Sequence, residues 1–191
     1  MKPYVLASLI VVLGCVTSSL ASPSDPAAMT IYDFKMKNID GKDVKLSRFR
    51  GKVLLVVNVA SKCGNTPQYT ALESLYKDNR GKGLVVLGFP ANNFGQQEPG
   101  TDAEIKEFCS ATYQVNFPMF SKISVKGDDE DPLYKWLIAN SDQPDEQIDW
   151  NFAKFVIGRD GKVFKRFKSR VKPDSPEVMD AINAALAANP H

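Results

Sequence analysis

Cys63 is the residue of this sequence that is best placed to do chemistry. It follows an apolar run over residues 53–60 and precedes Thr66-Pro67, a pair typical of a helix start. A buried strand before the cysteine would hold its backbone still. The dipole and the free N–H groups at the start of the following helix would favour a thiolate over a thiol. The placement of Cys63 therefore predicts redox chemistry at sulfur.

The composition narrows the classes of function. The chain has 191 residues, 43% of them hydrophobic, which is enough for one well-packed domain. Its 24 basic and 22 acidic residues give a net charge of +2, so nucleic acid is not expected as a partner. The single histidine, His191, leaves no Ser–His or Cys–His nucleophile pair and no His-ligated zinc site. Three cysteines without a C-x-x-C pattern also argue against a zinc ribbon, so we expect no metal.

The N-terminal residues have the pattern of an export signal. Lys2 supplies a positive charge, residues 5–16 are apolar but too few to span a bilayer, and Ser19-Leu20-Ala21 suits cleavage before Ser22. We therefore predict three parts: a signal peptide over residues 1–21, a flexible leader rich in Pro, Ser and Ala over 22–28, and one folded domain over 29–191.

Two alternatives to a cleaved signal peptide stay open. Val12-Leu13-Gly14-Cys15 partly resembles a bacterial lipoprotein signal, although Leu13 is bulkier than usual there. Lipidation of Cys15 would then anchor the protein to a membrane. The other alternative is a buried helix. With either signal the domain is exported, secreted or periplasmic, and Cys63 and Cys109 lie in a compartment where disulfides persist.

Strands and helices alternate along the predicted domain. Unbroken apolar runs indicate strands covered on both faces, and Thr101 with Glu104 forms a capping box that begins a helix. Thr66 is predicted to cap the N-terminus of the helix 66–80, with Pro67 at the first helical position. The predicted fold class is α/β, with a central mixed β-sheet that is flanked by helices on both faces. The predicted elements are a hairpin of 29–37 with 42–46, strands 53–60 and 84–89, helices 66–80, 101–113 and 132–140, a hairpin of 152–157 with 162–167, and a helix 175–188.

Three segments of the chain resemble the glutathione peroxidase family, in the family's order. They are the stretches 58–69 (NVASKCGNTPQY), 88–100 (GFPANNFGQQEPG) and 149–155 (DWNFAKF). The resemblance runs from about Met29 to the end of the chain and implies a thioredoxin-like fold. The family's catalytic tetrad falls on Cys63, Gln97, Trp150 and Asn151. Many animal members carry selenocysteine where this chain has Cys63.

The residue types suit the activity that the resemblance implies. A Cys63 thiolate attacks the O–O bond of a hydroperoxide and becomes a sulfenic acid. Gln97, Trp150 and Asn151 offer N–H groups that would favour the thiolate and orient the peroxide. Lys62, next to Cys63, is a further candidate for stabilising the thiolate.

Cys109 has two interpretations. Its helical spacing with Ile105, Phe108 and Thr112 predicts a small hydrophobe in the core. The resemblance instead implies a resolving cysteine, because two-cysteine members carry one in this helix. Helix unwinding would then precede a Cys63–Cys109 disulfide, since a disulfide needs Cα atoms within roughly 7 Å.

The chain departs from the family in ways that bear on the reductant. Many non-selenium members have a third cysteine where this chain has Ala91, so Cys109 is left as the internal resolver; Asn93 in the same loop has no functional interpretation. The segment 137–150 is short, as in monomeric members reduced by thioredoxin or a related dithiol protein. Glutathione is the alternative reductant, and the resemblance implies no organic cofactor.

Two other functions compete with a thiol peroxidase acting on hydrogen peroxide and organic, including lipid, hydroperoxides. A protein thiol–disulfide oxidoreductase would suit the fold, but the segment from Cys63 to Thr66 lacks the second cysteine of C-x-x-C. A non-catalytic domain with a structural Cys63–Cys109 disulfide would need none of Gln97, Trp150 and Asn151.

Overall fold

The computed structural model describes residues 29–188. The predicted signal peptide, the alternative lipid anchor at Cys15 and the predicted leader all lie outside these residues. Within the described range, none of the helices combines the length and the apolar character needed to cross a membrane.

A four-stranded mixed sheet forms the centre of the molecule. Its order is β4-β3-β5-β6, with β3 and β4 parallel and β5 antiparallel to both of its neighbours, β3 and β6. Every residue of β3 is buried, as the unbroken apolar run predicted. The strands are β3 (Val53–Val59), β4 (Leu84–Pro90), β5 (Lys154–Ile157) and β6 (Val163–Phe167).

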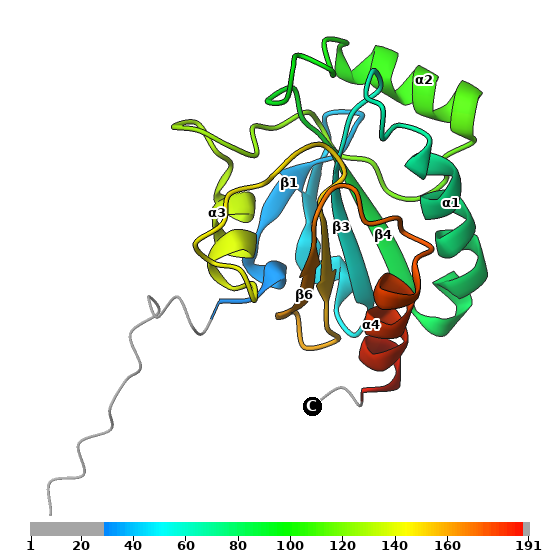
Figure 1. Ribbon diagram of the computed structural model, residues 1–191, viewed down its shortest axis with the longest axis vertical. Helices are drawn as coiled ribbons and strands as arrows, with labels where there is room; N and C mark the ends of the chain where they lie inside the picture. Colours follow the sequence, from blue (N-terminus) through cyan, green and yellow to red (C-terminus); the bar gives the residue numbers. More distant parts are fainter. Residues whose placement is uncertain (1–28, 189–191) are drawn as a thin grey trace, which may run out of the picture.

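Helices cover both faces of this sheet, which confirms the predicted architecture. Figure 1 shows α3 on one side and α1 and α4 on the other, with α2 beyond one end of the strands. Alternate residues of β3 enter two separate cores, Leu54 and Val56 on the α3 side and Val53, Leu55 and Val57 on the other. The helices are α1 (Gln68–Asn79), α2 (Asp102–Tyr113), α3 (Pro132–Ala139) and α4 (Pro176–Ala187), with 3-10 turns at Ile31–Asp33, Leu46–Phe49 and Arg80–Lys82.

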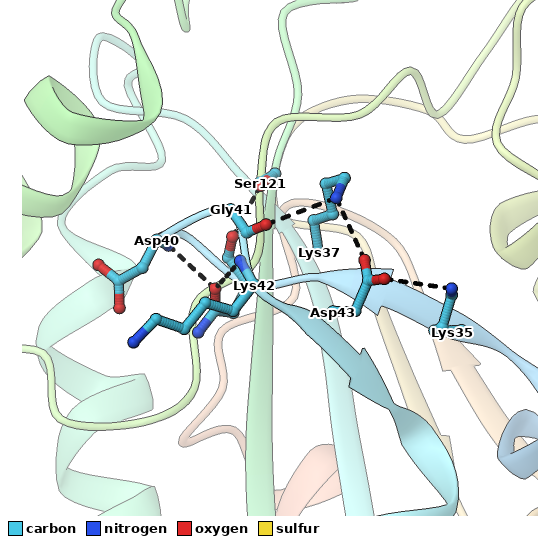
Figure 2. Close-up of polar contacts among 8 residues, drawn as sticks. Lys35, Lys37, Asp40, Gly41, Lys42, Asp43 and Ser121 are labelled. Carbon is cyan, nitrogen blue, oxygen red and sulfur yellow. Dashed lines mark hydrogen bonds and ion pairs between the residues drawn. The ribbon is translucent and has the colours of Figure 1, made fainter.

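The predicted N-terminal hairpin is present but shorter, as β1 (Lys35–Lys37) and β2 (Asp43–Lys45), because Ile31–Asp33 forms a 3-10 turn and not a strand. Figure 2 shows Asp43 between Lys35 and Lys37, whose ammonium groups each lie 3.2 Å from its carboxylate. At the tip, Asp40 pairs with Lys106 of α2 at 2.6 Å. The hairpin is therefore attached to the helix that carries Cys109.

The predicted cap of α1 is wrong. The helix begins at Gln68, and the Thr66 hydroxyl makes no hydrogen bond to its first turn. Thr66 Oγ1 instead accepts the N–H of Cys63 at 2.9 Å and donates to the carbonyl of Ala60 at 2.8 Å. The Thr66 hydroxyl therefore closes the turn around Cys63 and does not cap the helix. The capping box of α2 is confirmed, with Glu104 N–H 3.3 Å from Thr101 Oγ1.

Candidate active site

Cys63 lies on the turn between β3 and α1, half-buried, with a free thiol. Its Sγ accepts a hydrogen bond from the backbone N–H of Asn65 at 3.3 Å. The thiol lines a surface cleft of about 440 Å³. The other residues that line this cleft are Gly64, Asn65, Asp149, Trp150, Ser169 and Arg170.

A chain of hydrogen bonds joins the three segments that the sequence singled out. The N–H of Lys62 donates to the Gln97 carbonyl at 3.0 Å. The Asn151 side-chain amide donates to Gln97 Oε1 at 2.9 Å. Asn65, whose N–H contacts the sulfur of Cys63, donates its side-chain amide to the Asn151 carbonyl at 3.2 Å. The structure therefore brings Cys63, Gln97 and Asn151 to one place.

Trp150 lines the same cleft. The residue is 40% exposed, and its ring lies 5.4 Å from the ring of Phe94, measured between centroids. Its carbonyl accepts a hydrogen bond from the side chain of Asn58 at 3.1 Å. Asn58 is fully buried in β3, so it ties the turn of Trp150 to the central strand.

The polar groups of the site are not all directed at sulfur. Among residues 29–188, the hydrogen bond that Cys63 Sγ accepts comes from Asn65, while the Asn151 amide is engaged with Gln97. The Asn151 Oδ1 atom is buried and has no partner among the described residues. Lys62 takes part through its backbone, and its side chain is exposed.

Strained backbone holds both polar segments in place. Gln96, before Gln97, has φ of 53°, and Phe152, after Asn151, has φ of 75°. Side chains with a Cβ seldom adopt this left-handed region, and such residues concentrate at functional sites. The Phe152 N–H donates to the Asn58 carbonyl at 2.6 Å, which fastens the turn to β3. The sequence predicted that this strand begins at Phe152. Because Phe152 belongs to the turn, β5 begins at Lys154 instead.

Lys154 is a fully buried lysine behind the cleft. Its Nζ donates to the carbonyl of Phe152 at 2.6 Å and lies 3.5 Å from that of Ser169. Burial lowers the pKa of Lys154 from 10.5 to about 7, an effect that the charge of Asp149 opposes. The lysine therefore links the turn of Trp150 and Asn151 to Ser169, another residue that lines the cleft.

The lowered pKa of Lys154 predicts a pH dependence of stability. Between pH 7 and 10.5 an unfolded lysine binds a proton that the folded one has released, so the free energy of unfolding rises with pH. We expect a rise of about 1.5 kcal/mol from pH 7 to 8.5, from one proton at about 1.4 kcal/mol per pH unit. Urea unfolding of Lys154→Met should lack this rise. Lys162→Met, at an exposed lysine, should keep it, and parallel curves for wild type and Lys154→Met would contradict the assignment.

Cys109 lies in α2 with its thiol in the core, 2% exposed. Burial raises its pKa to about 11; the neighbouring Tyr69 hydroxyl opposes this shift and the charge of Glu98 adds to it. The Tyr69 hydroxyl is itself buried without a partner of hydrogen-bonding geometry among the described residues. The prediction that Cys109 packs in the core is confirmed, and a resolving role requires α2 to move.

Several residues of the site were not recognised from the sequence. Asn58 and Lys154 carried a signal, since each interrupts an otherwise apolar strand. Asn65 and Glu98 carried no sequence signal of their own, beyond lying near Cys63 and Gln97 in the chain. Residues 29–188 contain no cluster of three or more His, Cys, Asp or Glu side chains arranged to hold a metal ion.

Residues 31–138 match the family model described as "Glutathione peroxidase". The chain is 48% identical over 173 residues to "Thioredoxin/glutathione peroxidase BtuE" of Escherichia coli (strain K12), covering 80% of this chain and 94% of that relative. It is 51% identical over 152 residues to "Hydroperoxy fatty acid reductase gpx1" of Synechocystis sp., and this match covers 76% of this chain and 90% of that relative. The solved structure titled "Crystal structure of Trgpx in apo form" has a TM-score of 0.68 and 42% identity, covering 83% of this chain and 97% of that one. These likenesses confirm the predicted thioredoxin-like fold.

Proposed function

We propose that Cys63 is the residue that peroxide oxidises, because the chain belongs to the glutathione peroxidase family. The protein is a thiol peroxidase that reduces hydroperoxides. The Cys63 thiolate attacks one oxygen of the O–O bond. An S–O bond forms, the O–O bond breaks, and the second oxygen leaves as water or an alcohol after taking up a proton. Cys63 becomes a sulfenic acid.

The observation that carries this assignment is the hydrogen-bonded set around Cys63. Asn65 supplies an N–H to the sulfur, and Asn151 and Gln97 are held beside it by bonds to the neighbouring backbone. Donors fixed before reaction stabilise developing negative charge without reorganising. The buried Oδ1 of Asn151 has no partner among the described residues, and Trp150 lines the cleft together with Cys63.

Resolution by Cys109 is the second part of the proposal. Attack of the Cys109 sulfur on the Cys63 sulfenic acid gives a disulfide and water, and a dithiol protein of the thioredoxin type then reduces the disulfide. The relatives named thioredoxin/glutathione peroxidase and glutathione peroxidase-like peroxiredoxin support such a reductant. Glutathione is the alternative reductant. We also propose a monomer that is exported through the segment 1–21, with Cys15 as the alternative lipid anchor.

The function is tested by one equivalent of hydroperoxide added to the reduced protein, followed by rapid alkylation and mass spectrometry. The expected product is a Cys63–Cys109 disulfide, and thioredoxin with its reductase should restore both thiols. Cys63 carrying a stable sulfenic acid beside a free Cys109, followed by reduction with glutathione alone, would contradict the resolving role. A protein that consumes no hydroperoxide would contradict the assignment of Cys63.

The proposed role of Asn151 predicts a large effect of one substitution. Asn151→Asp removes the donor to Gln97 Oε1 and adds a negative charge to the hydrogen-bonded set around Cys63, where like charge disfavours a thiolate. We expect the rate constant for oxidation of Cys63 to fall by about 10²–10³-fold, measured by stopped-flow tryptophan fluorescence. Asn93→Asp is the matched control, since the Asn93 amide bonds Ser124 and the Lys126 carbonyl instead. Equal losses in both variants would argue against a specific role.

A further inference from the structure

Three consecutive backbone carbonyl groups, those of residues 150–152, each accept a hydrogen bond from a side chain. In chain order, their donors are the side chains of Asn58, Asn65 and Lys154, at 3.1, 3.2 and 2.6 Å. Buried carbonyl groups require such partners, and here the partners come from three different segments of the chain. The turn that carries Trp150 and Asn151 is therefore held in place partly by side chains.

The three donors differ in where they lie. Asn58 in β3 and Lys154 in β5 are fully buried, so they belong to the framework of the sheet. Asn65 is half-buried and lies two residues after Cys63. It lines both the cleft that contains Cys63 and a neighbouring groove of about 660 Å³ along α1. Its side chain can therefore be changed without opening a cavity in the core.

Asn65 connects the sulfur of Cys63 to Asn151 through two donor groups. Its backbone N–H donates to Cys63 Sγ at 3.3 Å, and its side-chain amide donates to the Asn151 carbonyl. The Asn151 amide donates in turn to Gln97 Oε1 at 2.9 Å. The Gln97 carbonyl accepts the N–H of Lys62, the residue before Cys63, at 3.0 Å. These bonds form a closed circuit that begins and ends at the Cys63 turn, and the Asn65 side chain closes it.

The closed circuit matters because it holds Asn151 from two sides. Without the Asn65 amide, Asn151 would keep its bond to Gln97 but would lose its direct bond to the Cys63 turn. Polar groups assist a reaction when they are fixed relative to the reacting atom beforehand, and small displacements of such groups lower the rate strongly. The contact between Asn65 and Asn151 is therefore placed where it can control oxidation of the sulfur.

We propose that the side-chain amide of Asn65 is a positioning group for the oxidation of Cys63. It fixes the main chain of Asn151 relative to the sulfur, so that the Asn151 side chain meets the hydroperoxide in one orientation. The amide makes and breaks no covalent bond, and its role rests on the functions proposed above for Cys63 and Asn151.

Asn65→Leu tests this role, because it removes the amide, keeps the size of the side chain and keeps the backbone N–H that bonds the sulfur. With limiting hydrogen peroxide at about pH 7, we expect the rate constant for oxidation of Cys63 to fall about 10-fold, measured by stopped-flow tryptophan fluorescence. Alkylation of Cys63 by iodoacetamide, followed by mass spectrometry, needs the sulfur but no oriented peroxide. Its rate should stay within about 2-fold of wild type.

Two further variants control for steric and general effects. Asn65→Ala cannot obstruct the cleft as leucine could, and it should show the same slow oxidation with unchanged alkylation. Asn140→Leu removes an amide that donates to the Trp136 carbonyl at 2.9 Å, at the end of α3, and should be oxidised at the wild-type rate.

A double-mutant cycle tests whether Asn65 acts through Asn151. In Asn151→Ala the Asn65 amide has no side chain left to position, so adding Asn65→Leu should slow oxidation by less than about 2-fold further. If the effects of the two substitutions multiply, Asn65 acts independently of Asn151 and the proposed role is wrong.

The remaining outcomes are equally distinct. Wild-type oxidation in Asn65→Leu, restored oxidation in Asn65→Ala, or an equal loss of oxidation and alkylation would each overturn the positioning role. If hydrogen peroxide does not oxidise Cys63 in the wild-type protein, the proposed function fails, and the role of Asn65 fails with it.

Discussion

Cys63→Ser is expected to lower hydroperoxide turnover by roughly 10⁴-fold or more while the protein stays folded. A serine hydroxyl is not ionised near neutral pH and is a poor nucleophile toward the O–O bond. Serine is also close to cysteine in size, and residue 63 is a half-buried free thiol, so little packing is lost. Peroxide consumption coupled to a thioredoxin system measures the loss, and a urea titration measures stability.

This substitution also separates the peroxidase from a domain with a structural disulfide. A structural Cys63–Cys109 bond would make Cys63→Ser destabilising by about 2–4 kcal/mol under oxidising conditions, with no peroxide turnover in wild type. In the structure both described cysteines are free. An unchanged unfolding midpoint together with lost turnover is the expected pattern, and the reverse pattern would contradict the peroxidase assignment of Cys63.

Cys109→Ser is expected to abolish thioredoxin-dependent turnover and to leave the first oxidation of Cys63 within about 2-fold of wild type. The sulfenic acid still forms, but no second thiol converts it to the disulfide that a dithiol protein reduces. A single-turnover measurement with limiting hydroperoxide reports the first step, and NADPH consumption in the coupled assay reports the whole cycle. Equal turnover with glutathione in both proteins would mean that Cys109 only packs in the core.

Cys109→Ser needs a control for destabilisation, because it places a hydroxyl in the core. Cys109 is 2% exposed, so a hydroxyl there without a partner is expected to cost about 1–3 kcal/mol. Cys109→Ala avoids the buried hydroxyl and should give the same loss of coupled turnover. If alanine restores turnover where serine does not, the loss reflects destabilisation and not missing resolution.

The placement of α2 makes this resolving step physically reasonable. The helix fully buries Ile105 and Cys109, and Phe108 and Tyr113 pack against the same core while partly buried. Polar contacts also hold it, among them the Asp40–Lys106 pair at the tip of the hairpin and the 2.9 Å hydrogen bond from the Lys122 N–H to Asp102. A helix held this way can unwind locally without disrupting the sheet that positions Cys63.

Local sequence was sufficient for much of the fold. Apolar runs predicted β3 and β4, because a strand covered on both faces is made mostly of apolar residues. The capping box at Thr101 and the turn around Gly161 have local causes, and both lie where they were predicted. The motifs around Cys63, Gln97 and Trp150 also indicated, through family resemblance, which residues would meet.

What the sequence by itself determined is therefore the set of elements, the family and the reactive sulfur, since each depends on residues close together in the chain. Tertiary structure alone decided which polar atoms pair. Thr66 turned away from α1 to hold Cys63, Asn151 donates to Gln97, and Lys154 lies buried behind the cleft. It also placed Glu98 in the cavity beside α2. These outcomes depend on hydrogen-bond competition and desolvation between segments remote in sequence, which periodicity and turn signals do not contain.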